Sequence, residues 1–266
     1  SLFTSELDKI ALMVNMMSVF ASAFTILFLF LTISIVSKKI VLKKNDNMVS
    51  LNSCFKIVGA SIIGSLSFTF SDSFWFNAVE AEVYAMATMI MALLFWLGFK
   101  WEENMEKDDG DRWLILISFV VGLSLGVHFM GLLAIPAIGM IYFFKKHPKP
   151  SLKNFVLANI VSVTILLFIF KLLLPSTLGL FGYLEVFFVN NLGLPFNSGT
   201  IFSALIIIIF FIYGLKLTRK KKLVKTNTLL LCVMFIFIGF SSWLMIPIRS
   251  NANTVINENA PSDARA

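Results

Sequence analysis

The feature that most constrains this chain is a run of 26 residues without a charged side chain, ALMVNMMSVFASAFTILFLFLTISIV (11–36). About 20 apolar residues cross the hydrocarbon core of a bilayer as a helix. Backbone groups in lipid must be hydrogen-bonded within their own segment unless they form a closed barrel, and the absence of strand-like alternation argues against a barrel. Since 58% of the 266 residues are hydrophobic and 14% are charged, the sequence predicts an integral, multi-pass membrane protein.

Further apolar runs predict a total of eight membrane segments. They are expected at 11–36, 55–70, 83–99, 113–127, 129–144, 154–174, 201–217 and 228–247. With this arrangement, 18 of the 22 Lys and Arg residues fall on one side of the membrane, which the positive-inside rule makes cytoplasmic. The exceptions are Lys9, Lys171, Arg249 and Arg265. The excess of basic residues therefore indicates membrane topology and contact with anionic lipid headgroups, and nucleic acid is not an expected partner.

Residues 113–144 carry no charge apart from that of His128 when it is protonated, and are flanked by Arg112 and Lys145. As a single helix they would be about 48 Å long, and as two helices they are too short for two ordinary crossings. The sequence therefore predicts a short or re-entrant hairpin with its apex near His128. Such an apex is tolerated only inside protein or beside a watery cavity, which we expect to open to the outer face.

The outer connection SDSFWFNAVEAEVYAM (71–86) sets three carboxylates among aromatic residues. If it is helical, with Ser71 or Asp72 as the N-cap, one face carries Ser73, Asn77, Glu80 and Tyr84. Asn77 and Tyr84 are candidate substrate-binding residues. One interpretation is an interfacial helix whose acids are simply wetted. The other is that Asp72, Glu80 or Glu82 acts as a general base, or holds a metal or the acceptor, kept partly dry by Phe74, Trp75 and Phe76.

Near the hairpin apex, Ser118, Gly122 and Gly126 repeat small residues at every fourth position, which predicts close helix packing. His128 follows directly. It is a candidate catalytic residue, because ionisable groups at membrane depth are usually functional, and a structural histidine bonded to a carbonyl is the alternative.

Two other regions on the outer side contain candidate substrate-binding residues. Arg249 closes the last span on the side where basic residues are scarce, so it suits a lipid-linked phosphate or a headgroup. Glu185, Asn190 and Asn191 lie in a connection (175–200) that is too apolar for a free loop; we expect an interfacial or re-entrant helix and a turn at 193–199.

The sequence contains no motif that would indicate nucleotide-driven, metal-dependent or serine-hydrolase chemistry. The chain has no Gly-rich phosphate loop, no paired Cys or His metal spacing and no Gly-x-Ser-x-Gly elbow. The inner segment EENMEKDDGD (102–111) is typical of a solvated linker.

Several long strings carry a family resemblance: FSDSFWFNAVEAEVYAM, FWLGFKWEE, DRWLILISFVVGLSLGVHFMGLLAIPA, EVFFVNNLGLPFNSG and IRSNANTVINENAP. They resemble successive blocks of a large bacterial membrane family, long catalogued as a domain of unknown function and grouped with the protein O-mannosyltransferases of the GT-C glycosyltransferase superfamily.

The resemblance implies an all-α, polytopic GT-C-like helical bundle over 1–247, followed by the start of a polar extracytoplasmic segment at 248–266. It implies an enzyme that moves a mannose-like sugar from a polyprenyl-phosphate carrier to Ser or Thr of an exported protein. It places the enzyme in the bacterial inner membrane, with its active face toward the periplasm. No resident cofactor is expected, and a divalent metal is optional. The resemblance also implies a fragment that begins after the family's acidic first outer loop and lacks a C-terminal region. Asp72, Glu80 and Glu82 would then assist the acceptor or donor rather than act as the sole base.

Two functions of other classes remain open on the sequence. A transporter or lipid flippase would use the interrupted helices of 113–144 as a midplane site. A non-catalytic envelope scaffold would tolerate neutralisation of every outer acid.

Overall fold

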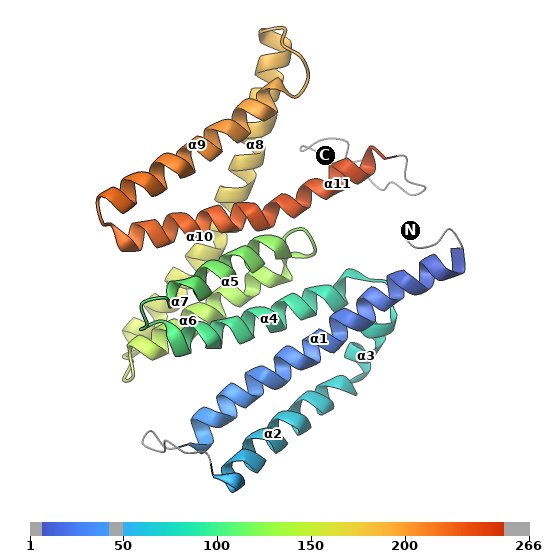
Figure 1. The fold of residues 1–266 in the computed structure, drawn as a ribbon, viewed down its shortest axis with the longest axis vertical. Helices are drawn as coiled ribbons and strands as arrows, with labels where there is room; N and C mark the ends of the chain where they lie inside the picture. The colour runs from blue at the N-terminus through green and yellow to red at the C-terminus, as the bar shows by residue number, and fades with distance from the viewer. Residues whose placement is uncertain (1–6, 43–49, 253–266) are drawn as a thin grey trace. The chain divides into compact units, whose positions relative to one another are not determined.

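The computed structural model describes residues 7–42 and 50–252, and in these residues every regular element is a helix (Figure 1). The chain forms two compact units. Unit 1 comprises Ser1–Trp113 and Val127–Lys145, and unit 2 comprises Leu114–Gly126 and Lys146–Ala266. The all-α class expected from the apolar runs is confirmed.

Unit 1 is built around its first helix. Its elements are α1 (Leu7–Val41), α2 (Leu51–Thr69), α3 (Asp72–Val79), α4 (Val83–Asn104), the 3₁₀ helix η1 (Phe129–Leu133) and α6 (Ala134–Lys146). Helix α1 packs against α2 and α4, and α3 also contacts α1. Small polar residues line the α1–α2 contact, where the hydroxyl of Ser34 donates to that of Ser61 at 2.8 Å. Such residues let helices approach closely where lipid removes the hydrophobic drive for association.

Unit 2 contains one long, irregular helical run and an antiparallel pair. Its elements are α5 (Asp111–Ser124), α7 (Leu152–Leu167), the π-helix η2 (Phe168–Leu173), α8 (Leu174–Val186), the π-helix η3 (Phe187–Asn191), α9 (Ser198–Lys220), α10 (Val224–Phe240), the 3₁₀ helix η4 (Ser241–Leu244) and α11 (Met245–Ser250). The first three residues of α5 belong to unit 1. Helix α9 packs against both α8 and α10.

The small-residue repeat of α5 meets α10 and η4. A Cβ atom added to Gly122 would lie 2.2 Å from the carbonyl oxygen of Ile236, and one added to Gly126 would lie 2.4 Å from the hydroxyl of Ser242. From the other side, a Cβ on Gly239 would lie 2.2 Å from the carbonyl oxygen of Phe119. The predicted close helix packing is confirmed.

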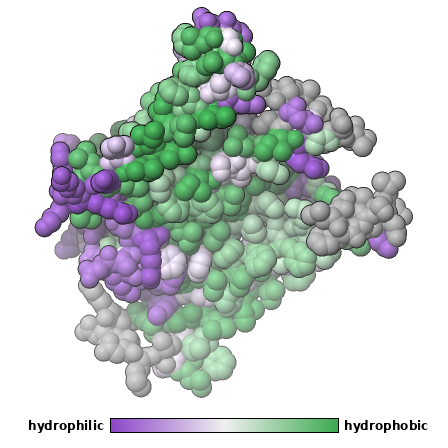
Figure 2. Space-filling view, turned by 45° about the horizontal axis from the view of Figure 1, so that its top comes forward, coloured by the Kyte–Doolittle hydropathy of each residue, from purple (hydrophilic) through white to green (hydrophobic). Residues whose placement is uncertain are grey.

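Seven helical stretches of the described residues are long and apolar enough to cross a membrane. They are Ala11–Val41, Leu51–Thr69, Val83–Asn104, Phe129–Lys146, Leu152–Asn191, Ser198–Lys220 and Val224–Ser250. The eighth expected segment, 113–127, is α5, which has 14 residues and is shorter than a crossing requires. The chain is thus a polytopic helical membrane protein. On the face drawn in Figure 2, hydrophobic residues cover most of the surface and hydrophilic residues gather in patches near its edges.

The predicted boundaries are wrong in two places. A helix over 71–86 is interrupted, because Glu80 and Glu82 have extended backbones between α3 and α4. The expected connection 175–200 is helical up to Asn191 and continues the run that starts at Leu152. Pro175 does not end the helix, because the π-helix η2 precedes it and Pro fits the first turn of α8. The expected turn follows, with Gly193 at φ 64°.

Candidate functional site

We call Asp72, Glu80 and Glu82, which are expected on the outer side, the outer acids. They are distributed around the short helix α3 and the break that follows it. Asp72 begins α3, Glu80 is its C-terminal cap, and Glu82 precedes the first residue of α4. Ser71 is the N-cap residue of α3, but its hydroxyl donates to the carbonyl of Phe68 at 2.8 Å. The negative charge of Glu82 lies beside the N-terminus of α4, where the helix dipole favours it.

Burial separates the acids from one another. Asp72 and Glu82 are exposed, whereas Glu80 is half-buried. Glu80 is therefore the least exposed of the three, and its catalytic role stays a prediction.

The aromatic residues expected to shield the acids mostly dock α3 on the end of α2. The ring of Phe74 is buried and lies 4.7 Å from that of Phe68. Trp75 stacks on Phe70 at 6.0 Å, and Phe76 is 62% exposed. The amide nitrogen of Asn77 donates to the carbonyl of Ser73 at 2.9 Å, so one of its polar groups is occupied within α3.

Tyr84 and His128 come together at the same end of α4 as Glu82. Their ring centroids are 5.7 Å apart, with 52° between the ring planes. The Nδ1 atom of His128 accepts the backbone N–H of Met130 at 3.2 Å and thereby caps η1. A neutral imidazole that accepts at Nδ1 carries its proton at Nε2, which leaves that atom as a donor. A structural histidine was expected to bond to a backbone carbonyl. Nδ1 of His128 instead accepts a backbone N–H.

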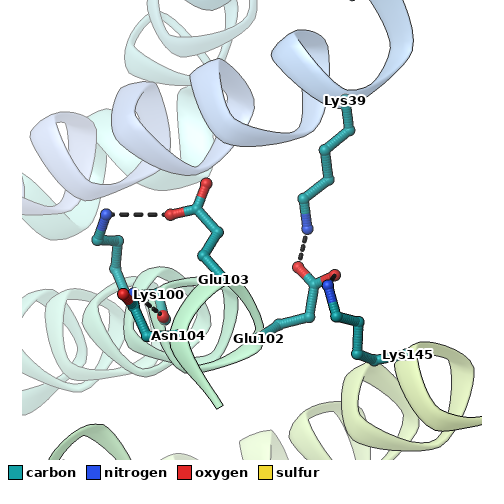
Figure 3. A network of polar contacts seen from close by, with 6 residues as sticks. All are labelled: Lys39, Lys100, Glu102, Glu103, Asn104 and Lys145. Atoms are coloured by element: carbon teal, nitrogen blue, oxygen red, sulfur yellow. Dashed lines mark hydrogen bonds and ion pairs between the residues drawn. The ribbon is translucent and has the colours of Figure 1, made fainter. Parts of the chain in front are cut away.

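The opposite end of unit 1 has different chemistry. Glu102, in the last turn of α4, pairs with Lys39 of α1 and with Lys145 of α6, the latter at 3.7 Å (Figure 3). Its neighbour Glu103 pairs with Lys100 at 3.0 Å. Glu102 was expected in a solvated linker, but it lies in α4 and its side chain is only 14% exposed. Glu103 and residues 106–109 of that segment are exposed, as expected. We call Lys39, Lys100, Glu102, Glu103 and Lys145 the ion-pair network.

The length of α4 separates the two ends. Its 22 residues span about 33 Å from Val83 to Asn104. Within unit 1, therefore, the outer acids and His128 lie about one membrane thickness from the ion-pair network.

In unit 2, Glu185 holds the beginning of α9. Its carboxylate accepts the backbone N–H of Asn197 at 2.6 Å, the N–H of Thr200 at 2.8 Å and the hydroxyl of Thr200 at 3.0 Å. Asn197, the N-cap residue, has φ 70° and makes no side-chain cap bond. A carboxylate from the preceding helix thus satisfies N–H groups that a helix start leaves open. The part of Glu185 in substrate binding stays a prediction.

The remaining predicted residues are exposed. Asn190 and Asn191 lie in the π-helix η3, and Arg249 lies in α11. These residues belong to unit 2, whereas Tyr84, His128 and the three acids belong to unit 1. Their convergence on one substrate stays a prediction. No group of three or more His, Cys, Asp or Glu residues suited to a metal ion occurs in the described part of the chain.

Comparison with known proteins identifies one family. Residues 1–151 match the family model of the protein O-mannosyl-transferase TMEM260 N-terminal domain. The match covers all of unit 1, including Tyr84, His128 and the three acids. No curated protein and no solved structure matches the chain.

Proposed function

The chain belongs to the TMEM260 N-terminal-domain family of protein O-mannosyltransferases, and we propose that it uses a polyprenyl-phosphate sugar as donor. A membrane protein O-glycosyltransferase is the function that the family supports. The proposal adds that the sugar is mannose-like and that the acceptor is a Ser or Thr hydroxyl of an exported protein. It also adds that transfer takes place on the non-cytoplasmic face.

The observation that carries this proposal is the division of unit 1 into two ends. Glu80, Glu82, Tyr84 and His128 cluster around the start of α4, and the lysine-rich network surrounds its last turn. Lysines concentrate on the cytoplasmic side of membrane proteins. The acids and the histidine then face the compartment in which an exported protein meets its glycosylating enzyme.

The reaction needs a base, an open path to the anomeric carbon and a stabilised leaving group. A carboxylate takes the proton of the acceptor hydroxyl while the hydroxyl oxygen forms a bond to the anomeric carbon. The bond from that carbon to the phosphate oxygen breaks, and polyprenyl phosphate leaves with the electron pair. We assign the base to Glu80, because it is the least exposed of the three acids and lies in the break between α3 and α4.

Positive or proton-donating groups would stabilise the departing phosphate. The Nε2–H of His128 is available because Nδ1 is engaged with Met130. In unit 2, the exposed guanidinium of Arg249 has the planar donor geometry that binds phosphate in two hydrogen bonds. We propose that His128 contacts the donor phosphate, and Arg249 stays a predicted phosphate-binding residue of unit 2.

A transfer assay on the full-length protein tests this function. Membranes that contain the protein would receive a radiolabelled polyprenyl-phosphate mannose and a Ser/Thr-rich acceptor peptide, and label in the peptide would be measured. Glu80→Gln is expected to lower the rate by about 10²–10⁴, the range for loss of a general base. Asp108→Asn, in the exposed linker at the other end of α4, removes an acid without touching the site and is the matched control.

Equal rates for wild type, Glu80→Gln and Asp108→Asn would remove Glu80 from the mechanism. A parallel series with Asp72→Asn and Glu82→Gln would then show whether another outer acid is the base. Absence of any label with the wild-type protein, in membranes where it is folded, would overturn the choice of donor.

A further inference from the structure

The lysine-rich end of unit 1 contains a groove that the proposed reaction does not use. Lys38, Lys39 and Leu42, at the end of α1, line it together with Glu103 of α4. Its volume is about 330 Å³. This is at the lower end of the range of roughly 300–1,000 Å³ typical of ligand pockets.

The charges around this groove are not balanced. Four ammonium groups, those of Lys38, Lys39, Lys100 and Lys145, surround the carboxylates of Glu102 and Glu103. Within residues 7–42 and 50–252, Lys38 forms no ion pair, whereas Glu103, the acid in the groove, is matched by Lys100. Among the residues that the structure describes, the groove therefore has an excess of positive charge, because Lys38 lacks a carboxylate partner there. Such a groove suits an anion.

Apolar surface beside the groove favours a lipid over a free anion. Leu42 forms part of its lining, and the neighbouring Ile40 is 79% exposed. Lys39 Nζ lies 5.0 Å from the ring centroid of Phe99, so its ammonium group stays beside an apolar surface. Only Ser37 separates Lys38 and Lys39 from the uncharged run 11–36, which places both lysines at the level of the headgroups.

We propose that the groove formed by Lys38, Lys39, Leu42 and Glu103 binds the phosphate of an anionic phospholipid from the adjacent leaflet. Basic pockets between membrane helices on the cytoplasmic side bind such headgroups. Lys38 contacts the phosphate, and Leu42 lies against the start of an acyl chain. The ion-pair network fixes Lys39 and joins α1, α4 and α6 beneath the lipid.

Native mass spectrometry of the purified full-length protein tests this site. Phosphatidylglycerol, phosphatidylcholine and inorganic phosphate would be titrated separately into detergent-solubilised protein. We expect phosphatidylglycerol to bind more tightly than the other two. Lys38→Gln is expected to weaken its binding about fivefold, the contribution of one lysine near a membrane surface.

Lys56→Gln is the matched control, since Lys56 is an exposed lysine at the same end of unit 1, on α2 and outside the groove. It is expected to leave the affinity for phosphatidylglycerol unchanged. Equal loss in both variants would show general surface electrostatics and overturn the site. Equal affinity for phosphatidylcholine, or for inorganic phosphate, would likewise overturn it.

Discussion

The ring of Tyr84, at the start of α4, lies 5.7 Å from the imidazole of His128, 44 residues later in the chain. The contact joins the break after α3 to the interruption between α5 and α6. Since His128 also caps η1 through Nδ1, its ring is held at both its face and one nitrogen. The ring is therefore held in place with Nε2 as its remaining donor.

Two substitutions at His128 distinguish its role as the cap of η1, through Nδ1, from its role as a hydrogen-bond donor, through Nε2. In His128→Asn, the side-chain oxygen replaces Nδ1 as the acceptor for Met130 but no atom replaces Nε2. We expect this variant to retain its melting temperature and to lose about 10² in transfer rate, as for removal of one donor to developing charge. His128→Gln, which places its amide near the Nε2 position, should retain more activity and melt earlier. The reverse pattern would make His128 a structural cap.

The two ends of α4 are expected to be accessible from opposite compartments. Cysteines would be introduced as Glu82→Cys and Asp108→Cys in a protein with Cys54→Ser and Cys232→Ala. A membrane-impermeant maleimide added outside sealed cells should label the first at once and the second only after permeabilisation.

The same labelling also tests the assignment of Arg249. Arg249→Cys should react from the same compartment as Glu82→Cys. Labelling of the two positions from opposite compartments would remove Arg249 from the residues predicted to bind the donor.

Glu185 is expected to stabilise the beginning of α9. Glu185→Gln replaces one of the two carboxylate oxygens that accept the N–H groups of Asn197 and Thr200, and it removes the negative charge. Amide hydrogen exchange at these two positions should therefore accelerate about fivefold, the effect of a lost cap. Thr200→Val removes only the hydroxyl bond and should have a smaller effect. If Glu185→Gln abolishes transfer without changing exchange, Glu185 binds substrate instead.

The crossing of α5 and α10 does not admit a methyl group. Gly122→Ala places a Cβ 2.2 Å from the carbonyl oxygen of Ile236, and the backbone must move to relieve the clash. We expect a loss of about 1–3 kcal/mol in unfolding free energy, measured by thermal denaturation in detergent. Gly179→Ala, in α8, meets no atom within 4 Å and should be neutral or slightly stabilising. Equal melting of the two variants would contradict this packing.

Glu102 is expected to join three helices of unit 1. Glu102→Gln leaves Lys39 and Lys145 without their partner and should cost about 1–2 kcal/mol, since the carboxylate is only 14% exposed. Asp109→Asn breaks an exposed pair with Arg112 and should cost much less. A double-mutant cycle of Glu102→Gln with Lys39→Gln should show coupling, and strict additivity would argue against the pair.

The sequence by itself determined the helical membrane class, the approximate positions of most apolar segments, the interruption near His128 and the small-residue face of α5. Each of these depends on hydropathy or spacing within one segment, and a bilayer permits few structures for such a segment. Family membership likewise followed from strings of neighbouring residues.

Only the tertiary structure decided which side chains meet. The pairing of Tyr84 with His128, the placement of Glu102 between Lys39 and Lys145, and the use of Glu185 at the start of α9 depend on the register in which separate helices pack. The break at Glu80–Glu82 was missed because the spacing of polar residues there also suits a continuous helix. Local periodicity fixes which residues share a face, but packing between segments fixes what that face contacts.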